Sequence, residues 1–273
     1  MKFIKLTMSY MGKNFLYLFL MALIPAIFWG STLSPFQPIE FINTYSTIPV
    51  VAFGSIFNAF FQFGWLQLLL SLVTLVLLAI FISAILGQIE QHFRSGKLNV
   101  NAIKDHVNNH ILIVVANLVA LFVIGFMLLF ATSAILFLLH LLISGINASP
   151  TVFNVVVANV LLSIMFILYS VIASIIFVNT ANMMSDGSEF RYSFSNSIKL
   201  TQKNNFKLSV GIIAPYLLIT VLISLFVYSE LLVVINIIGV LFLIMYYTSF
   251  AMTSYYELSK LDRYDKRKKY YRR

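Results

Sequence analysis

The apolar residues of this sequence fall into six long blocks that contain no Asp, Glu, Lys or Arg. The blocks are residues 15–33, 49–87, 111–145, 152–184, 208–228 and 231–256. A helix of about 20 apolar residues is what the roughly 30 Å hydrocarbon core of a bilayer requires. The chain is 60% hydrophobic and only 10% charged, whereas a soluble domain carries roughly 25% charged residues. The sequence therefore predicts an all-α fold, a polytopic transmembrane bundle of about six helices in one membrane domain, residues 1–273.

Two of the blocks are longer than one membrane crossing needs. Residues 49–87 would form a helix roughly 58 Å long at 1.5 Å per residue. The stretch before Trp65 is aromatic and contains glycine. We therefore predict a spanning helix over 65–87 and an interfacial or broken helix over 49–64. The third block, 111–145, is also too long, and in both blocks the excess lies at the end away from the basic loops. This excess apolar surface needs cover from neighbouring helices, lipid or a partner.

All 18 lysine and arginine residues lie on one side of the predicted topology. They precede the first helix, connect the second to the third and the fourth to the fifth, and follow the sixth. The alternate loops carry only Glu40 and Glu230 as charges. Because Lys and Arg stay on the cytoplasmic side, the pattern predicts a multi-pass protein of the cell (plasma) membrane with both termini in the cytoplasm.

The tail after the sixth helix, residues 257–273, is strongly basic. Its last eight positions hold Lys266, Arg267, Lys268, Lys269, Arg272 and Arg273. Such a cluster beside a membrane helix attracts anionic lipid by about 1 kcal/mol per basic residue. We therefore expect these six side chains to contact anionic lipid on the cytoplasmic side. We expect no nucleic-acid partner, because no folded reader accompanies the basic arm.

A short pattern recurs before three of the predicted helices. The first copy is Ile4-Lys5-Leu6-Thr7, the third is Ile198-Lys199-Leu200-Thr201, and a fainter second copy is Asn101-Ala102-Ile103-Lys104. Three repeated helical hairpins would give this spacing, and so would chance in a composition this biased. Both explanations stay open, and since repeats are common to transporters and scaffolds, neither decides the function.

The motifs of common catalytic and cofactor sites are missing. The sequence contains no HExxH helix, no GxSxG and no Gly-rich phosphate loop with a following Lys. His106 and His110 stand four residues apart, a spacing that can place two metal ligands on one helix face. No glutamate lies between them, which favours an exposed stretch at the membrane surface. We therefore expect no enzymatic activity, no cofactor and no metal.

Polar side chains inside the predicted helices form the remaining candidate site. The candidates are Asn117, His140, Asn159 and Asn236, with further amides at Asn58, Gln62, Gln67 and Asn179. In hydrocarbon such groups must find partners, and ionisable ones cost about 2.5–3.5 kcal/mol. Two interpretations remain, a polar pathway or hydrogen bonds between packed helices, and the second is favoured for the amides. For His140 a neutral, hydrogen-bonded imidazole near the membrane interface is favoured.

Small residues at four-residue spacing mark two close helix contacts. The stripes are Ala22, Ala26 and Gly30 in the first helix and Ala79, Ser83 and Gly87 in the second. Small side chains let helix backbones approach each other in a membrane. We expect packing within the first hairpin, with an oligomer contact as the alternative.

The segment before the fifth helix carries a resemblance to a known group of proteins. It begins at Asp186-Gly187-Ser188, and a short polar helix is predicted over residues 193–200 before the membrane helix. From its second helix onward the chain resembles the membrane domains fused to some bacterial glycerophosphodiester phosphodiesterases, and related stand-alone six-helix membrane proteins. The resemblance implies a bacterial membrane protein. It lies outside the hydrolase domain, so it carries over no catalytic residue.

Together these features predict a non-enzymatic integral membrane protein that acts as an accessory or scaffold. It would serve lipid or envelope handling, or stand beside a transport or export complex. The alternative is a transporter or channel subunit with a pathway lined by the intramembrane asparagines. Membrane lipids are the expected partners, and a membrane protein or a second copy of the chain is the further option.

Overall fold

The computed structural model describes residues 2–32, 53–60, 65–144, 151–226 and 229–266 of the chain. Within these ranges the elements are α-helices and two short 3₁₀ helices, without a strand. The described part contains five helices long and apolar enough to cross a membrane, or six if the first two, which meet at 93°, form one span. The predicted all-α bundle is confirmed. The length and apolar composition of these helices fit a multi-pass integral membrane protein.

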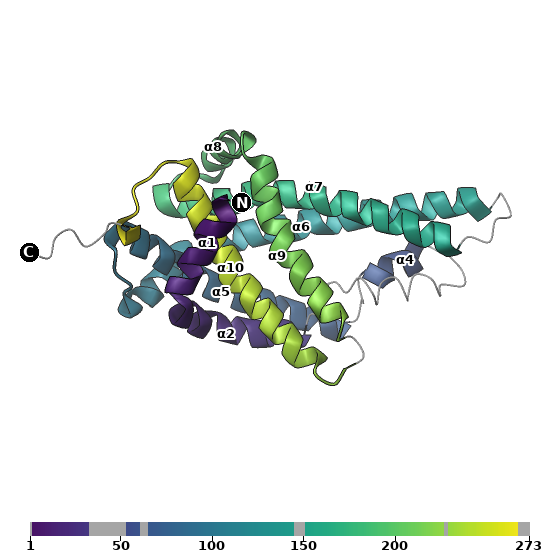
Figure 1. Cartoon of the computed structure of the whole chain (residues 1–273), viewed down its shortest axis with the longest axis horizontal. Helices are drawn as coiled ribbons and strands as arrows, with labels where there is room; N and C mark the ends of the chain where they lie inside the picture. The colour runs from purple at the N-terminus through teal and green to yellow at the C-terminus, as the bar shows by residue number, and fades with distance from the viewer. Residues whose placement is uncertain (1, 33–52, 61–64, 145–150, 227–228, 267–273) are drawn as a thin grey trace, which may run out of the picture.

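The helices follow one another through the described ranges of the chain (Figure 1). They are α1 (Lys2–Lys13), α2 (Phe15–Thr32), α4 (Phe53–Phe60), α5 (Trp65–Ser95), η1 (Val100–Ala102), α6 (Ile103–Ser144), α7 (Thr151–Asp186), α8 (Phe190–Gln202), α9 (Asn205–Ser224), α10 (Leu232–Leu258) and η2 (Tyr264–Lys266). Several extend beyond the apolar blocks, as α5 does past Gly87. The reason is that the polar residues there are compatible with a helix, so the apolar block marks the hydrocarbon and not the helix end.

The bundle is formed by α2, α5, α9 and α10 with the adjoining halves of α6 and α7 (Figure 1). Buried side chains of the core are most numerous along α10, where Tyr246, Phe250 and Met252 are almost completely buried. In the most apolar stretches of α5 and α10, 56% of residues are buried, against 11% in α6 and 22% in α7. Most of α6 and α7 therefore presents its apolar side chains outward.

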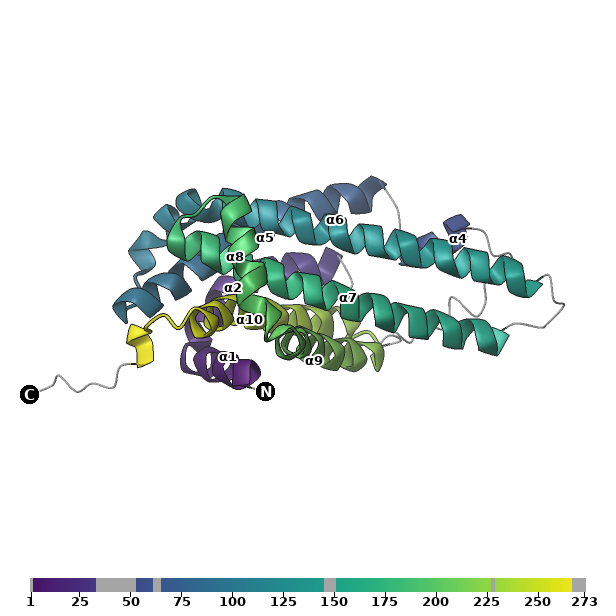
Figure 2. The same ribbon diagram turned by 90° about the horizontal axis from the view of Figure 1, so that it is seen from above.

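The far part of α6 and α7 extends beyond the rest of the bundle as a hairpin (Figure 2). We call residues 126–144 of α6 and 151–165 of α7 the projecting hairpin. Helix α4 lies along it, with the ring of Phe57 5.7 Å from that of Phe126 and the ring of Phe53 5.1 Å from that of Phe130. Part of the residue range expected to be interfacial or broken is thus a short helix packed on α6. Residues 61–64, which belong to the aromatic stretch before Trp65 where a break was expected, lie outside the described residues.

The opposite end of the bundle gathers the basic segments of the chain (Figure 1). Helix α1, the α5–α6 connection, α8 with the start of α9, and η2 all lie there, and we call this the basic end. The α5–α6 connection is held by Gln88, whose side-chain nitrogen donates to the carbonyl of Asn99 at 2.6 Å. The Asn99 amide donates back to the Gln88 side-chain oxygen at 3.3 Å. Four segments far apart in the sequence thus form one surface.

Two copies of the repeated tetrapeptide have the same local structure. Each lies in a short helix, α1 or α8, that breaks before a long one, α2 or α9. The threonine that ends the tetrapeptide is fully buried in both copies, at Thr7 and Thr201. The middle copy differs, because α6 runs from Ile103 through Lys104 without a break. Only the first and third approaches therefore share a helix–break–helix design.

The two helices of the first hairpin, α2 and α5, pack against each other, but the glycine that ends each small-residue stripe contacts another helix. A Cβ atom on Gly30 would lie 2.6 Å from the Cα atom of Ile237 in α10. A Cβ atom on Gly87 would lie 2.6 Å from the Cβ atom of His106 in α6. At these two glycines the expectation of packing within the first hairpin is wrong, because each faces a helix other than its hairpin partner.

Candidate functional site

A pair of buried asparagines joins α6 to α7. The side-chain nitrogen of Asn179 donates to the side-chain oxygen of Asn117 at 3.0 Å. Asn117 in turn donates to the carbonyl of Ile113, one turn earlier in its own helix, at 2.8 Å. Both asparagines are almost completely buried. In a membrane such a bond between helices contributes about 0.6–1.7 kcal/mol, so this pair fixes the register of α6 against α7.

Asn236 lies at a different contact, between α10 and α2. It is buried, and its side-chain nitrogen donates to the carbonyl of Gly30 at 3.3 Å. The donation is possible because the two backbones come close where Gly30 has no side chain. Asn117 and Asn236 therefore belong to separate helix pairs, each with a hydrogen bond across the pair.

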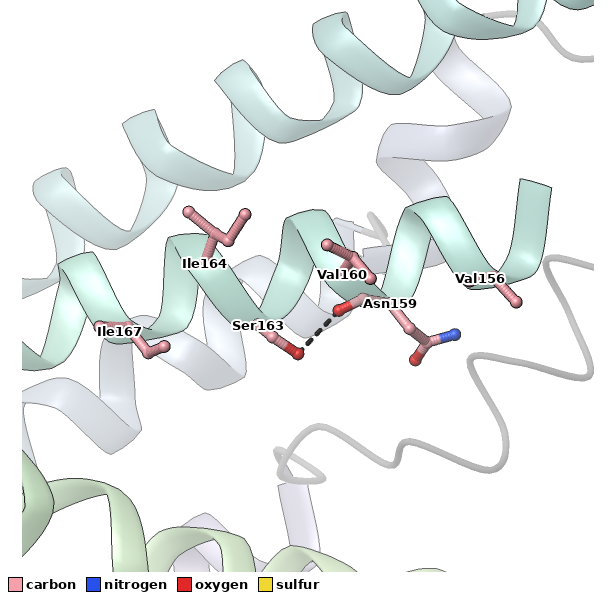
Figure 3. Close-up of a pocket in the computed structure, with 6 residues that line it drawn as sticks. All are labelled: Val156, Asn159, Val160, Ser163, Ile164 and Ile167. Carbon is pink, nitrogen blue, oxygen red and sulfur yellow. Dashed lines mark hydrogen bonds between the residues drawn. The ribbon is translucent and has the colours of Figure 1, made fainter. Parts of the chain in front are cut away.

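Asn159 lies on the projecting hairpin, away from both of these contacts. It is half-buried and borders a shallow recess of about 410 Å³ on the surface of α7 (Figure 3). The other lining residues are Val156, Val160, Ser163, Ile164 and Ile167, all from α7. The Ser163 hydroxyl donates to the backbone carbonyl of Asn159 at 2.8 Å, inside the helix. The recess is thus a mostly apolar dip on one helix.

The remaining sequence candidates fall at the limits of the described structure. His140 is part of α6, and its side chain lies outside the described part. Lys266 ends η2, again without a described side chain. The other predicted lipid contacts, Arg267, Lys268, Lys269, Arg272 and Arg273, lie outside the described residues, as do Gln62 and the side chains of Asn58 and Gln67.

The two histidines at metal-ligand spacing lie at the basic end. The rings of His106 and His110 stack with centroids 6.1 Å apart. The ring nitrogen Nε2 of His106 lies 2.9 Å from the side-chain oxygen of Gln91 in α5. In the part of the chain that the structure describes, no group of three or more metal-ligating side chains gathers around them. The observed role of His106 is a polar contact between α5 and α6.

A second polar contact joins α7 to α8. Helix α8 buries Ser193, Ser197 and Thr201, which are spaced four apart on one face. Asn182 of α7 donates its side-chain nitrogen to the carbonyl of Ser193 at 3.2 Å and to the hydroxyl of Ser197 at 3.4 Å. Because this face consists of small polar side chains, α8 can lie close across the end of α7.

A proline in α9 is matched by a tyrosine in α10. Pro215 has no N–H, so the carbonyl of Gly211, four residues earlier, has no backbone donor from that position. The hydroxyl of Tyr246 donates to this carbonyl at 2.9 Å. The hydroxyl of the next residue, Tyr247, donates to the carbonyl of Ile212, also at 2.9 Å. Tyr246 therefore replaces, from a neighbouring helix, the backbone bond that Pro215 removes, and Tyr247 adds a bond to the next carbonyl.

Charged side chains hold three helices together at the basic end. Glu90 pairs with Arg94 one turn later in α5 at 2.6 Å. Arg94 also donates to the carbonyl of Ser185 near the end of α7. The neighbouring Asp186 accepts a hydrogen bond from the hydroxyl of Tyr255 in α10 at 3.0 Å. The cluster therefore connects α5, α7 and α10 through charge-assisted bonds, which are roughly twice as strong as neutral ones.

The chain after α10 folds back onto the ends of α1 and α5. The guanidinium of Arg263 lies 3.8 Å from the ring centre of Phe93 and 5.6 Å from that of Tyr10. It pairs with Asp265 at 2.8 Å, and both side chains are largely buried. Tyr10 also contacts the Nδ1 atom of His92 at 3.1 Å, and burial raises the pKa of its hydroxyl well above the usual value. Arg263 is thus fixed between aromatic rings and a carboxylate.

Sequence reasoning missed the two most specific of these contacts. Arg263 was grouped with the basic tail, because a positive charge after a last helix indicates only orientation. The partner of Pro215 was not identified, although a proline within a membrane helix signals a free carbonyl four residues earlier. Nothing in one sequence tells which neighbouring side chain reaches that carbonyl.

Comparison of the chain with models of protein families, with curated proteins and with solved structures gives no match.

Proposed function

We propose that this protein is a non-enzymatic accessory or scaffold protein of a bacterial cell membrane, with both termini in the cytoplasm. It would act in lipid or envelope handling, or beside a transport or export complex. The bacterial setting follows the resemblance to the membrane domains of glycerophosphodiester phosphodiesterases. The observation that carries the proposal is the projecting hairpin of α6 and α7.

The hairpin offers more apolar surface than one bilayer crossing can cover. At 1.5 Å per residue the 42 residues of α6 and the 36 of α7 are roughly 63 and 54 Å long, against a hydrocarbon core of roughly 30 Å. No Asp, Glu, Lys or Arg lies between Asp105 and Asp186. Exposed large side chains run along both helices, among them Met127, Leu138, Val160 and Ile164. Large uncovered apolar patches mark interaction sites, and a partner membrane protein would cover this one.

The buried amides support a packing role over a conducting one. Asn117, Asn179 and Asn236 donate to one another or to backbone carbonyls. Hydrogen bonds of this kind hold membrane helices together.

The alternative, a transporter or channel subunit, has one observation in its favour. The hydroxyls of Ser209, Ser249 and Ser254, in α9 and α10, are buried and form no hydrogen bond within the described part of the chain. Water inside the bundle would satisfy them, as it does other buried polar groups. A transport role would need this water to connect both faces of the membrane.

Extraction in polymer discs with native lipid, followed by mass spectrometry, tests the proposal. The test variant carries Met127→Ala, Leu142→Ala, Val160→Ala and Ile164→Ala, which trims exposed side chains of the projecting hairpin. The matched control carries Leu217→Ala, Leu218→Ala, Val221→Ala and Leu222→Ala, exposed side chains of α9. We expect a stoichiometric protein partner with the wild type and the control, and its loss with the test variant.

Two results would count against the accessory role. One is a partner that the hairpin variant retains at wild-type level, because the hairpin would then not be its docking surface. The other is enrichment of a lipid or small molecule without any protein, which would favour transport.

A further inference from the structure

Helix α8 has a second face, opposite the one that packs on α7. At 3.6 residues per turn, Lys199 lies about 200° around the helix from the buried Ser197. Tyr192, seven residues before Lys199, lies on nearly the same line and is 71% exposed. Lys199 and Lys203 are also exposed. The outward face of α8, together with the C-cap residue Lys203 that follows it, therefore combines an aromatic ring with two lysines.

The start of α9 continues this combination at the beginning of a membrane-spanning helix. Phe206 is 81% exposed, and the neighbouring Lys207 is exposed as well. Lys199, Lys203 and Lys207 follow one another at four-residue spacing across the break between the two helices. An exposed aromatic ring where an apolar helix begins lies at the level of the lipid headgroups.

The three ammonium groups are not neutralised by acidic side chains. The ion pairs of the described residues involve Lys2 with Glu257, Arg94 with Glu90, and Arg263 with Asp265. In the described ranges Lys199, Lys203 and Lys207 belong to none of them. Three uncompensated positive charges next to apolar rings match a ligand with an anionic head and an apolar body.

The first copy of the repeat shows the same association. Lys5 and Lys13 of α1 are exposed, and Phe15, the first residue of α2, is 53% exposed. The buried Thr7 and Thr201 orient both short helices with these lysines outward. The pairing of lysines with an aromatic ring thus belongs to the helix–break–helix unit itself.

We propose that α8 and the start of α9 form a binding site for an anionic phospholipid. Lys199, Lys203 and Lys207 contact the headgroup phosphate, and Tyr192 and Phe206 lie against the glycerol and acyl chains. Long lysine side chains reach a headgroup while their methylene groups stay on apolar surface, and each basic residue near the leaflet strengthens the attraction. A soluble anion would use the lysines but not the rings. The site lies at the basic end, so it is independent of the projecting hairpin.

Lipid titration of the full-length, delipidated protein in nonionic detergent, read by native mass spectrometry, tests the site. The probes are phosphatidylglycerol and phosphatidylcholine with identical acyl chains, and glycerol phosphate as a soluble headgroup. The test variant is Lys199→Gln, Lys203→Gln, Lys207→Gln. The control, Lys97→Gln, Lys104→Gln, Lys260→Gln, removes the same charge from other exposed positions at the basic end. A second test variant, Phe206→Ala, leaves every charge in place.

We expect phosphatidylglycerol to bind the wild type and the control with equal affinity, and the triple test variant roughly tenfold or more weakly. Phe206→Ala should also weaken binding, and phosphatidylcholine should bind all forms weakly. Equal weakening in the control would overturn the proposal, since net charge alone would then govern binding. Undiminished binding to the test variant would also overturn it, as would glycerol phosphate that binds as tightly as the lipid. The two proposals can fail separately. If the polymer-disc experiment finds no protein partner but this titration finds the lipid site, only the proposed accessory function is overturned.

Discussion

The hydroxyl of Tyr246 donates at 2.9 Å to the carbonyl of Gly211, the acceptor that Pro215 leaves without its helical N–H. Tyr246→Phe should lower the free energy of unfolding by about 1 kcal/mol, which is typical of a hydrogen bond between membrane helices. In a Pro215→Ala background the backbone N–H returns, so the same substitution should lower it less. Unfolding by SDS titration in mixed micelles measures both. Equal losses in the two backgrounds would show that the hydroxyl does not compensate for the proline.

A second prediction concerns the asparagine pair between α6 and α7. Asn117→Leu and Asn179→Leu should each destabilise the protein, because each leaves the other buried amide without its partner. The double variant should lose less than the sum of the two, with a coupling of about 1 kcal/mol. Asn109→Leu, at an exposed position of the same helix, serves as the control. Additive losses in the SDS titration would refute a direct bond between the two side chains.

The third prediction tests the close contact of α2 with α10. Gly30→Ala places a methyl group 2.6 Å from the Cα atom of Ile237, and backbone cannot yield as a flexible side chain can. We expect a loss of about 1–3 kcal/mol, the usual cost of overpacking. In Gly12→Ala the new methyl group meets nothing within 4 Å, so stability should be equal or slightly higher. A harmless Gly30→Ala would mean that the two helices are farther apart.

The fourth prediction concerns the fold-back of the chain onto Phe93 and Tyr10. Phe93→Leu removes the ring under the Arg263 guanidinium but leaves every tryptic site intact. Since this contact holds the segment in place, trypsin should cleave after Lys260 severalfold faster in the variant. Limited proteolysis with mass spectrometry gives the rates, and cleavage after the exposed Lys97 is the internal control. An unchanged rate after Lys260 would mean that the ring contact does not hold the segment.

The fifth prediction separates packing from transport. The chain has no cysteine, so Asn117→Cys, Asn236→Cys and Lys97→Cys each introduce a single thiol. In sealed inside-out vesicles, which expose the proposed cytoplasmic side, a membrane-impermeant thiol reagent should label the exposed position 97 and leave the two buried positions unlabelled. Labelling at position 117 or 236 would place water beside the amides and favour the transport alternative.

The sequence could predict which segments form membrane helices but not which helices meet. Uninterrupted apolar blocks identify α2, α5, α6, α7, α9 and α10, because leaving water drives their insertion. Contacts between helices follow another rule, since lipid tails are as apolar as leucine side chains and give no hydrophobic preference. The approach of Gly30 to Ile237 depends on local shape, which hydropathy does not record.

The candidate site was predictable only as a set of residue types. Intramembrane asparagines stand out by their polarity, yet the pairing of Asn117 with Asn179 depends on the register of two helices. Arg263 is concealed in a different way, because it stands among tail residues of the same charge. Its distinct role comes from the aromatic rings of Phe93 and Tyr10, which are remote in sequence.

The absence of charge between Asp105 and Asp186 has a consequence for biogenesis. A helical pair enters the bilayer in the direction that its flanking cations dictate, and this pair has none at its turn. Its orientation must come from the cations that flank the pair in the sequence. These are Arg94, Lys97 and Lys104 before α6, and Arg191 and the lysines after it that follow α7. The two helices can therefore enter as one unit without moving a formal charge across the bilayer. A single lysine placed at their turn would favour keeping the turn in the cytoplasm. It would thereby oppose the orientation that the flanking cations favour.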